Sequence, residues 1–380
     1  MTELADFFTP ISIPKQRKIT GTLMEYVDGH FLTFPNWREA DIVIMGIFDE
    51  EQQFSVEAIR SQLYALSSPV ANIALADLGN LVAQNNREAL YEMVSFVVSS
   101  LIAEDKTVII LSPNQDITYG QYLAYSELGN GIQYVHVDAE LDMDEQEGTT
   151  LSKRFNHKIF QHKPSFLYSY TNLGYQRYLV SEEELSYLTA SYQQAIRYGE
   201  LNQQIEEAEP YIRTADMLSF DFSAIRAAEA PGAIQPSPGG FSAMEACRIA
   251  RYAGLAYHLS SISITSYVPQ FDYRNQGALL SAMLVWYFME GYYNRYDDYP
   301  DEERSQLRRY AVKLHATVET IHFFEHLRTG RWWMEVPYQI SGKAPSGPGI
   351  LIPCSKKDYE FAKGDDIPDK WWVTYSKISK

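Results

Sequence analysis

The stretch "YVHVDAELDM", Tyr134 to Met143, joins an apolar run to a group of acids. The run is rich in β-branched and aromatic residues, which is typical of a buried strand. Asp138, Glu140 and Asp142 occupy alternate positions, and alternation by two places their carboxylates on one face of an extended chain. Carboxylates that lie so close need a metal ion, a basic partner or open water. The stretch therefore predicts a metal site, a salt-bridged cluster or a solvated loop at a strand end.

Further apolar runs predict more buried strands, and helical segments alternate with them. The runs are "DIVIMGIF" (41–48), "VANIALAD" (70–77), "TVIILS" (107–112), "PSFLYSY" (164–170), "DMLSFDF" (216–222) and "LSSISITSYV" (259–268). Helices are expected over 54–67, 84–103, 118–129, 181–200, 274–297 and 301–328. Capping boxes at Ser181 with Glu184 and at Ser242 with Glu245 mark two helix starts. This alternation predicts a three-layer α/β/α sandwich with a mainly parallel sheet of about eight strands.

The composition changes after about residue 330. The segment "RWWMEVPYQISGKAPSGPGILIPC" combines a tryptophan pair with prolines and glycines. We therefore expect one main α/β domain over 1–328 and an irregular C-terminal extension over 329–380 that packs on it. The tryptophan pairs, Trp332–Trp333 and Trp371–Trp372, are interpreted as packing on the chain's own surface, with an interface as the alternative.

The overall charge excludes some classes of partner. The chain has 380 residues, 46% of them hydrophobic, and a formal net charge of −17. Nucleic acids and anionic membrane surfaces require clustered Lys and Arg, so neither is an expected partner. No apolar run reaches the length of a membrane span, and the first residues lack the apolar core of a signal peptide. Two cysteines provide no disulfide framework, so a cytoplasmic location is predicted.

A second acidic motif belongs to the same predicted site. Ligands of parallel sheets bind outside the carboxyl ends of the strands, where both "VDAELD" and Asp221 fall. The motif "DMLSFDFSAIRAAEAPG", Asp216 to Gly232, together with "VDAELD" and the strand end "ILSPNQD", resembles the arginase or ureohydrolase superfamily, in particular its formimidoylglutamase-like branch. The order and spacing of the motifs agree over roughly residues 40–300.

The resemblance implies a site of two manganese ions held by four aspartates and two histidines. Three of the aspartates are present as Asp138, Asp142 and Asp221. The remaining family positions carry other residues. The two ligand histidines are replaced by Gln115 and Glu140, and the fourth aspartate is replaced by Ser223. Arg226 stands in place of an acid of the following motif, and Ser266 in place of the glutamate that the family uses to hold the substrate.

These changes predict that the paired-metal site is lost. Hydrolysis at such a site uses a water between two cations, and an amide at Gln115 and a hydroxyl at Ser223 are weak ligands. The remaining oxygen cluster, made of Asp138, Glu140, Asp142 and Asp221, suits at most one hard ion: magnesium, calcium or manganese. No other cofactor is expected. Without an ion, Arg226, Lys153 or Arg154 would neutralise the acids.

Two histidines near the motif remain to be interpreted. His136 points to the same strand face as Asp138, one pleat deeper, and is interpreted as a core histidine rather than a ligand. His157 lies where the resemblance implies a proton-shuttling histidine, and a surface histidine beside Lys158 is an equal alternative. His157 and Arg226 are thus candidates for the rim of the site.

The sequence supports two functional hypotheses. The first is a catalytically inactive arginase-fold protein, a pseudo-ureohydrolase that binds a small molecule or a protein partner at the old active-site rim. The alternative is a metal-dependent hydrolase of C–N bonds in linear amidines, formimidoylglutamase-like, with an atypical site. A homo-oligomer would agree with the resemblance.

Overall fold

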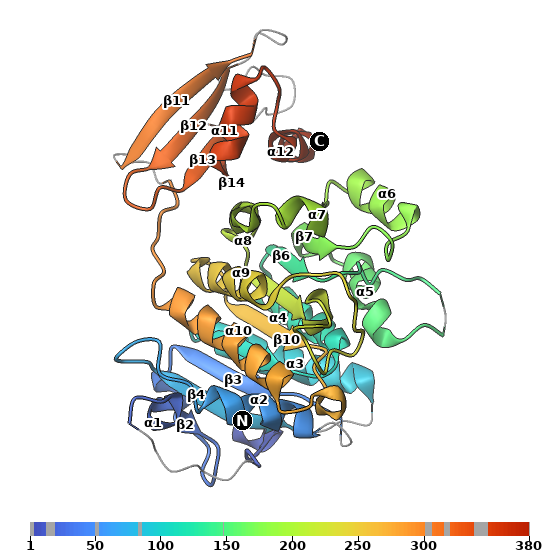
Figure 1. Cartoon of the computed structure of the whole chain (residues 1–380), viewed down its shortest axis with the longest axis vertical. Coiled ribbons are helices and arrows are strands. Elements are labelled where there is room, and N and C mark those ends of the chain that lie inside the picture. Colours follow the sequence, from blue (N-terminus) through green and yellow to red (C-terminus); the bar gives the residue numbers. More distant parts are fainter. Residues whose placement is uncertain are drawn as a thin grey trace.

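The computed structural model describes residues 4–12, 20–49, 53–82, 86–146, 148–300, 306–314, 320–337 and 349–379. Its main body is a ten-stranded sheet with helices on both faces (Figure 1). Eight parallel strands form the centre, in the order β4 (Leu75–Leu81), β3 (Ile42–Gly46), β5 (Thr107–Leu111), β10 (Ser261–Thr265), β9 (Met217–Asp221), β6 (Ile132–Val137), β7 (Leu167–Tyr175) and β8 (Gln194–Arg197). The short strands β1 (Phe8–Thr9) and β2 (Asp28–Gly29) pair with β4 at the edge. The mainly parallel sheet is therefore confirmed.

The helices of the main body vary from one turn to more than four turns. They are α1 (Leu23–Tyr26), α2 (Gln53–Leu63), α3 (Arg87–Ile102), α4 (Thr118–Leu128), α5 (Phe155–Gln161), α6 (Glu182–Ala190), α7 (Tyr198–Leu201), α8 (Glu209–Ile212), α9 (Ala243–Leu255) and α10 (Gln276–Tyr292). Both predicted capping boxes are present, at the starts of α6 and α9. Within the described part of the chain, no helix is both long and apolar enough to cross a membrane.

The two faces of the sheet are buried against different helices, which gives the three layers. Ile42 and Ile44 of β3 belong to a core cluster that includes residues of α2, α9 and α10. Val43 and Met45, which point to the other face, pack with residues of α3. Because side chains alternate along a strand, both faces of β3 must be apolar, which explains its continuous run. The three-layer sandwich is thus confirmed (Figure 1).

The region predicted as one helix over 181–200 contains two elements. Helix α6 ends at Ala190, and residues 194–197 form the edge strand β8, which pairs with β7. Tyr192 between them has a positive φ of 54°, which breaks the helix. The sequence pattern is ambiguous here because β8 is half-buried and short.

The C-terminal part forms a small antiparallel sheet rather than an irregular extension. Its strands are β11 (Leu307–Lys313), β12 (Thr320–His326), β13 (Trp332–Val336) and β14 (Ile350–Cys354), followed by α11 (Lys356–Lys363) and α12 (Asp369–Ile378). The helix expected over 301–328 is wrong, because β11 and β12 lie there; residues 301–305 and 315–319 of that range are outside the described residues. The boundary expected at residue 328 falls between β12 and β13, which pair.

The small sheet packs against the main body through α8. Arg213, at the end of α8, donates hydrogen bonds to the carbonyl oxygen of Trp332 (2.6 Å) and forms an ion pair with Glu209 (2.5 Å). Its guanidinium also lies 5.0 Å from the ring centre of Trp333, which is buried. Arg331 pairs with the same Glu209 at 3.1 Å. The first tryptophan pair therefore packs within the chain, as predicted.

Candidate metal centre

Four neighbouring strands direct polar residues to one rim of the sheet. Gln115 follows β5, Asp138 follows β6, Asp221 ends β9, and Ser266 follows β10. Because β5, β10, β9 and β6 are parallel neighbours, their carboxyl ends lie side by side. A pocket of about 320 Å³ opens there, and six of the residues singled out from the sequence line it: Gln115, Asp138, Glu140, Asp142, Asp221 and Ser223.

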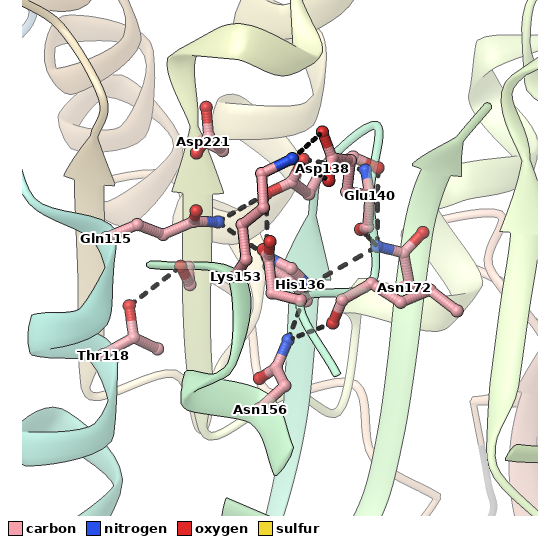
Figure 2. A network of polar contacts seen from close by, with 12 residues as sticks. Gln115, Thr118, His136, Asp138, Glu140, Lys153, Asn156, Asn172 and Asp221 are labelled. Atoms are coloured by element: carbon pink, nitrogen blue, oxygen red, sulfur yellow. Dashed lines mark hydrogen bonds and ion pairs between the residues drawn. The ribbon is translucent and has the colours of Figure 1, made fainter. Parts of the chain in front are cut away.

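Asp138 lies at the centre of the hydrogen-bond network (Figure 2). Its Oδ1 accepts from the backbone N–H of Glu140 at 3.0 Å, and its Oδ2 accepts from the side-chain amide of Gln115. Nε2 of His136 lies 3.2 Å from the same Oδ2. Burial raises the pKa of Asp138, but the hydrogen bond and charge of His136 and the two N–H donors outweigh burial, so the pKa is lowered. Asp138 is therefore the carboxylate that stays ionised.

The other two aspartates carry raised pKa values. Burial and the charge of Asp138 raise the pKa of Asp142 well above its usual value, and the same two causes raise that of Asp221. Asp221 accepts from the backbone N–H of Ser223 at 2.5 Å and from Oγ of Ser266 at 2.6 Å. By contrast, Oδ2 of Asp142 is buried and has no hydrogen-bond partner among the described residues. The site therefore holds more carboxylate groups than its hydrogen bonds can satisfy.

His136 is buried and hydrogen-bonded, as expected of a core histidine, and it also stands beside the acids. The ring is fully buried, and its Nε2 lies 3.7 Å from Oδ2 of Asp142 as well as close to Asp138. On its other side, Nδ1 contacts the hydroxyl of Tyr170 at 3.0 Å and the amide of Asn156 at 3.1 Å. Ligand atoms of His136, Asp138 and Asp142 all lie within 4.8 Å of one another. The signal in the sequence was the shared strand face of His136 and Asp138.

The expectation of three carboxylates on one face of an extended chain is wrong in its geometry, because the chain bends after β6, although Glu140 lines the same pocket as Asp138 and Asp142. Strand β6 ends at Val137, the N–H of Glu140 turns back onto Asp138, and Asp142 has a positive φ of 54°. These bends break the alternation of an extended chain. The carboxylate of Glu140 instead binds Nζ of Lys153, at 2.9 and 3.2 Å.

The basic residue that pairs with an acid of the site is Lys153, which binds Glu140, and not Arg226. Arg226 forms an ion pair with Glu229 at 2.5 Å. His157, on α5, lies 3.6 Å from a carboxylate oxygen of Glu145. Among the sequence-based candidates for a basic partner, Lys153 alone has an ion pair with an acid of the site, as far as the described residues show.

The residues present fit one divalent cation. The buried oxygen of Asp142 that lacks a partner, the ionised Asp138 and the imidazole of His136 form a compact set of oxygen and nitrogen donors. Such a mixed set suits manganese or a similar ion. A second ion has weaker support, because Ser223 turns its hydroxyl to the backbone N–H of Gln235 at 3.2 Å.

The fold and the site define a three-layer α/β protein with a candidate metal centre at the carboxyl rim of its parallel sheet. The model of the arginase family matches residues 42–290, which include every strand end of the site. The chain belongs to the arginase family.

Its similar proteins include formimidoylglutamases. The enzyme of Staphylococcus haemolyticus is 27% identical over 226 residues, which cover 57% of this chain and 71% of the relative. Formimidoylglutamase of Bacillus subtilis superimposes with a TM-score of 0.63 at 16% identity, over 73% of this chain and 94% of that structure. Formiminoglutamase of Trypanosoma cruzi, solved with Mn2+2, superimposes with a TM-score of 0.62 at 18% identity, over 68% and 95% of the two chains. At these identities the solved structures establish the fold alone.

Proposed function

We propose that this chain is a metal-dependent hydrolase of C–N bonds in linear amidines, formimidoylglutamase-like, with an atypical centre for one divalent ion. The observation that carries the proposal is the compact group of His136, Asp138 and Asp142, with one buried carboxylate oxygen that lacks a partner in the described structure. Membership of the arginase family and the similarity to formimidoylglutamases support the reaction class. A bound divalent ion would supply Lewis-acid activation of water.

The protein's own residues would have distinct tasks. His136, Asp138 and Asp142 would hold the ion, and Asp221, fixed by Ser223 and Ser266, would line the same rim. The pocket of about 320 Å³ has room for a small molecule. Its acidic wall would attract a cationic amidine group.

The test is hydrolysis of formimidoylglutamate, agmatine, arginine and guanidinobutyrate with added manganese, magnesium or calcium. We expect release of formamide, ammonia or urea from at least one of them, and Asp138→Asn should abolish it. Asp144→Asn is the control, because Asp144 is half-buried and binds Gln146 and Thr149 instead of the centre. Absence of product from every combination would refute the proposal.

The second candidate is a catalytically silent protein that binds a small molecule or a protein at this rim. It is favoured by Gln115, Ser223 and Ser266, which replace strong ligands or substrate contacts of the family, and by the pair of Glu140 with Lys153. The hydrolysis assay separates the two candidates, because a silent protein releases no product whether or not it binds an ion.

Location and assembly are part of the proposal. Cys247 and Cys354 are buried free thiols, which supports a cytoplasmic location because reducing compartments keep thiols free. We also propose a homo-oligomer, with neither nucleic acid nor membrane as a partner, in keeping with the acidic net charge of −17.

A further inference from the structure

Lys153 is held in place beside the acidic loop by its backbone as well as by its side chain. The backbone N–H of Asp144 donates to the carbonyl oxygen of Lys153 at 3.0 Å, which ties the two segments together. Nζ then reaches both carboxylate oxygens of Glu140, at 2.9 and 3.2 Å (Figure 2). Glu140 is itself fixed, because the amide of Asn172 donates to its carbonyl oxygen at 3.0 Å. The ammonium group is therefore positioned by the fold.

The ammonium group binds a residue that the family resemblance places among the ligands of the paired-metal site. Glu140 occupies the position of a ligand histidine, and both of its oxygens are engaged by Lys153. Of the lysines and arginines in the described part of the chain, Lys153 is the one whose ion pair reaches the group Asp138, Glu140, Asp142 and Asp221. A second ion bound at Glu140 would have to displace this cation and would be repelled by it.

We propose that the Lys153 ammonium group replaces a second metal ion, so that the centre combines one divalent cation with one tethered monovalent cation. The inference rests on the metal-binding part of the proposed function and does not require turnover. A fixed ammonium group supplies positive charge beside Asp138 without using any ligand, which agrees with the loss of strong ligands at Ser223. It also gives Glu140, which is longer than the imidazole it replaces, a fixed partner at the rim of the pocket.

An ordinary surface ion pair is the alternative explanation, and exposed pairs contribute little. The chain provides a comparison in Lys158 of α5, whose Nζ lies 2.6 Å from a carboxylate oxygen of Glu88 on α3. The side chains of Lys153 and Lys158 are exposed to a similar degree, 38% and 29%. Replacing each lysine by Met removes the same charge from a paired lysine. Lys158 also lies over the rings of Tyr91 and Tyr119, outside the centre, so only Lys153→Met removes a charge at the centre.

The experiment counts manganese ions in the full-length protein. Titration calorimetry with Mn2+ alone gives the stoichiometry, and electron paramagnetic resonance distinguishes an isolated ion from an exchange-coupled pair. We expect one isolated ion for the unmodified protein and for Lys158→Met, and a coupled pair for Lys153→Met. The double variant Lys153→Met with Glu140→Gln should return to one ion, since the second site then loses its carboxylate. Lys153→Gln serves the same purpose if the Met variant does not fold.

The outcomes separate this inference from the proposed function. Two ions in the unmodified protein would overturn the role of Lys153 while leaving a metal hydrolase intact. One ion in both the unmodified protein and the Lys153 variants would also overturn it. Binding of no ion by any variant would overturn both, whereas one bound ion without turnover would remove the hydrolase and preserve the inference.

Discussion

Replacing Asp142 by Asn tests whether its buried carboxyl group destabilises the protein when no cation is bound. Oδ2 of Asp142 has no hydrogen-bond partner among the described residues, and Asp138 lies beside it as an ionised neighbour. A buried polar atom without a partner costs about 1–3 kcal/mol. An Asn amide at position 142 stays neutral at every pH and can donate to Asp138. It should therefore recover much of that cost at a pH above the raised pKa of Asp142, where the carboxyl is ionised.

The expected change in melting temperature follows from the size of the main body. An unfolding entropy of about 2.1 cal/mol/K per residue over about 300 residues gives about 0.6 kcal/mol/K, so Asp142→Asn should melt about 2–5 °C higher in EDTA. With manganese at about 100 times its dissociation constant, the unmodified protein should gain about 2.7 kcal/mol, and the variant should gain much less. Manganese should therefore narrow the difference between the two melting temperatures, and should reverse their order where the variant's gain in EDTA is below about 2.7 kcal/mol.

Differential scanning calorimetry in EDTA and in manganese provides the measurement. Asp144→Asn, the same substitution at a half-buried, hydrogen-bonded acid two residues along the chain, should show no gain in EDTA and should keep the manganese response. The reasoning fails if Asp142→Asn melts below the unmodified protein in EDTA, or if it keeps the full manganese response.

Three further predictions concern the frame of the site. Arginines and a lysine lower the pKa of Glu209 in spite of its burial. Its stabilising effect is therefore present above the unfolded pKa of about 4.3 and is lost as the pH falls from there through the lower folded pKa. Glu209→Gln should cost about 3 kcal/mol in urea denaturation at pH 7 and progressively less as the pH falls below about 4.3. Gly254→Ala should cost about 1–3 kcal/mol by the same assay at pH 7. Its new methyl group would clash with the carbonyl oxygen of Phe288 where α9 crosses α10, so an unchanged stability would contradict this close packing. A chain cut after residue 330 keeps β11 and β12 but loses β13 and β14, so light scattering should reveal aggregation; a monodisperse product would contradict the packing of the small sheet.

The strand ends of the site were predictable because each depends on local sequence. Apolar runs predicted seven of the eight parallel strands, and Asp138 and Asp221 follow two of them at one rim. The direction of Glu140 was not predictable, because it depends on a bend stabilised by Asp138 and on a lysine thirteen residues away. The position of His136 beside Asp142 likewise depends on the left-handed conformation of Asp142, which no periodicity indicates.

The small C-terminal sheet was missed because its pattern is weak. Strand β11, "LRRYAVK", is mostly exposed and lies at the edge, so it has little of the apolar alternation that marks a strand. Strand β11 pairs with β12, and the sequence of both segments also fits the pattern of an amphipathic helix, so the sequence did not distinguish the two structures. Helix α10, by contrast, is strongly apolar and was predicted within a few residues of its true ends.

The order of strands has a consequence for how this chain can be made. Strand β10 (Ser261–Thr265) pairs with β5 on one side and with β9 on the other, so it joins two half-sheets. A ribosome that adds about 5–20 residues per second makes both halves well before β10 leaves it. Until then, the inner edges of β5 and β9 have no β10 to pair with, and unpaired strand edges invite association with other chains. The nascent protein should therefore depend most on chaperones after β9 has been made and before β10 follows, which is while the segment between Asp221 and Ser261 is synthesised.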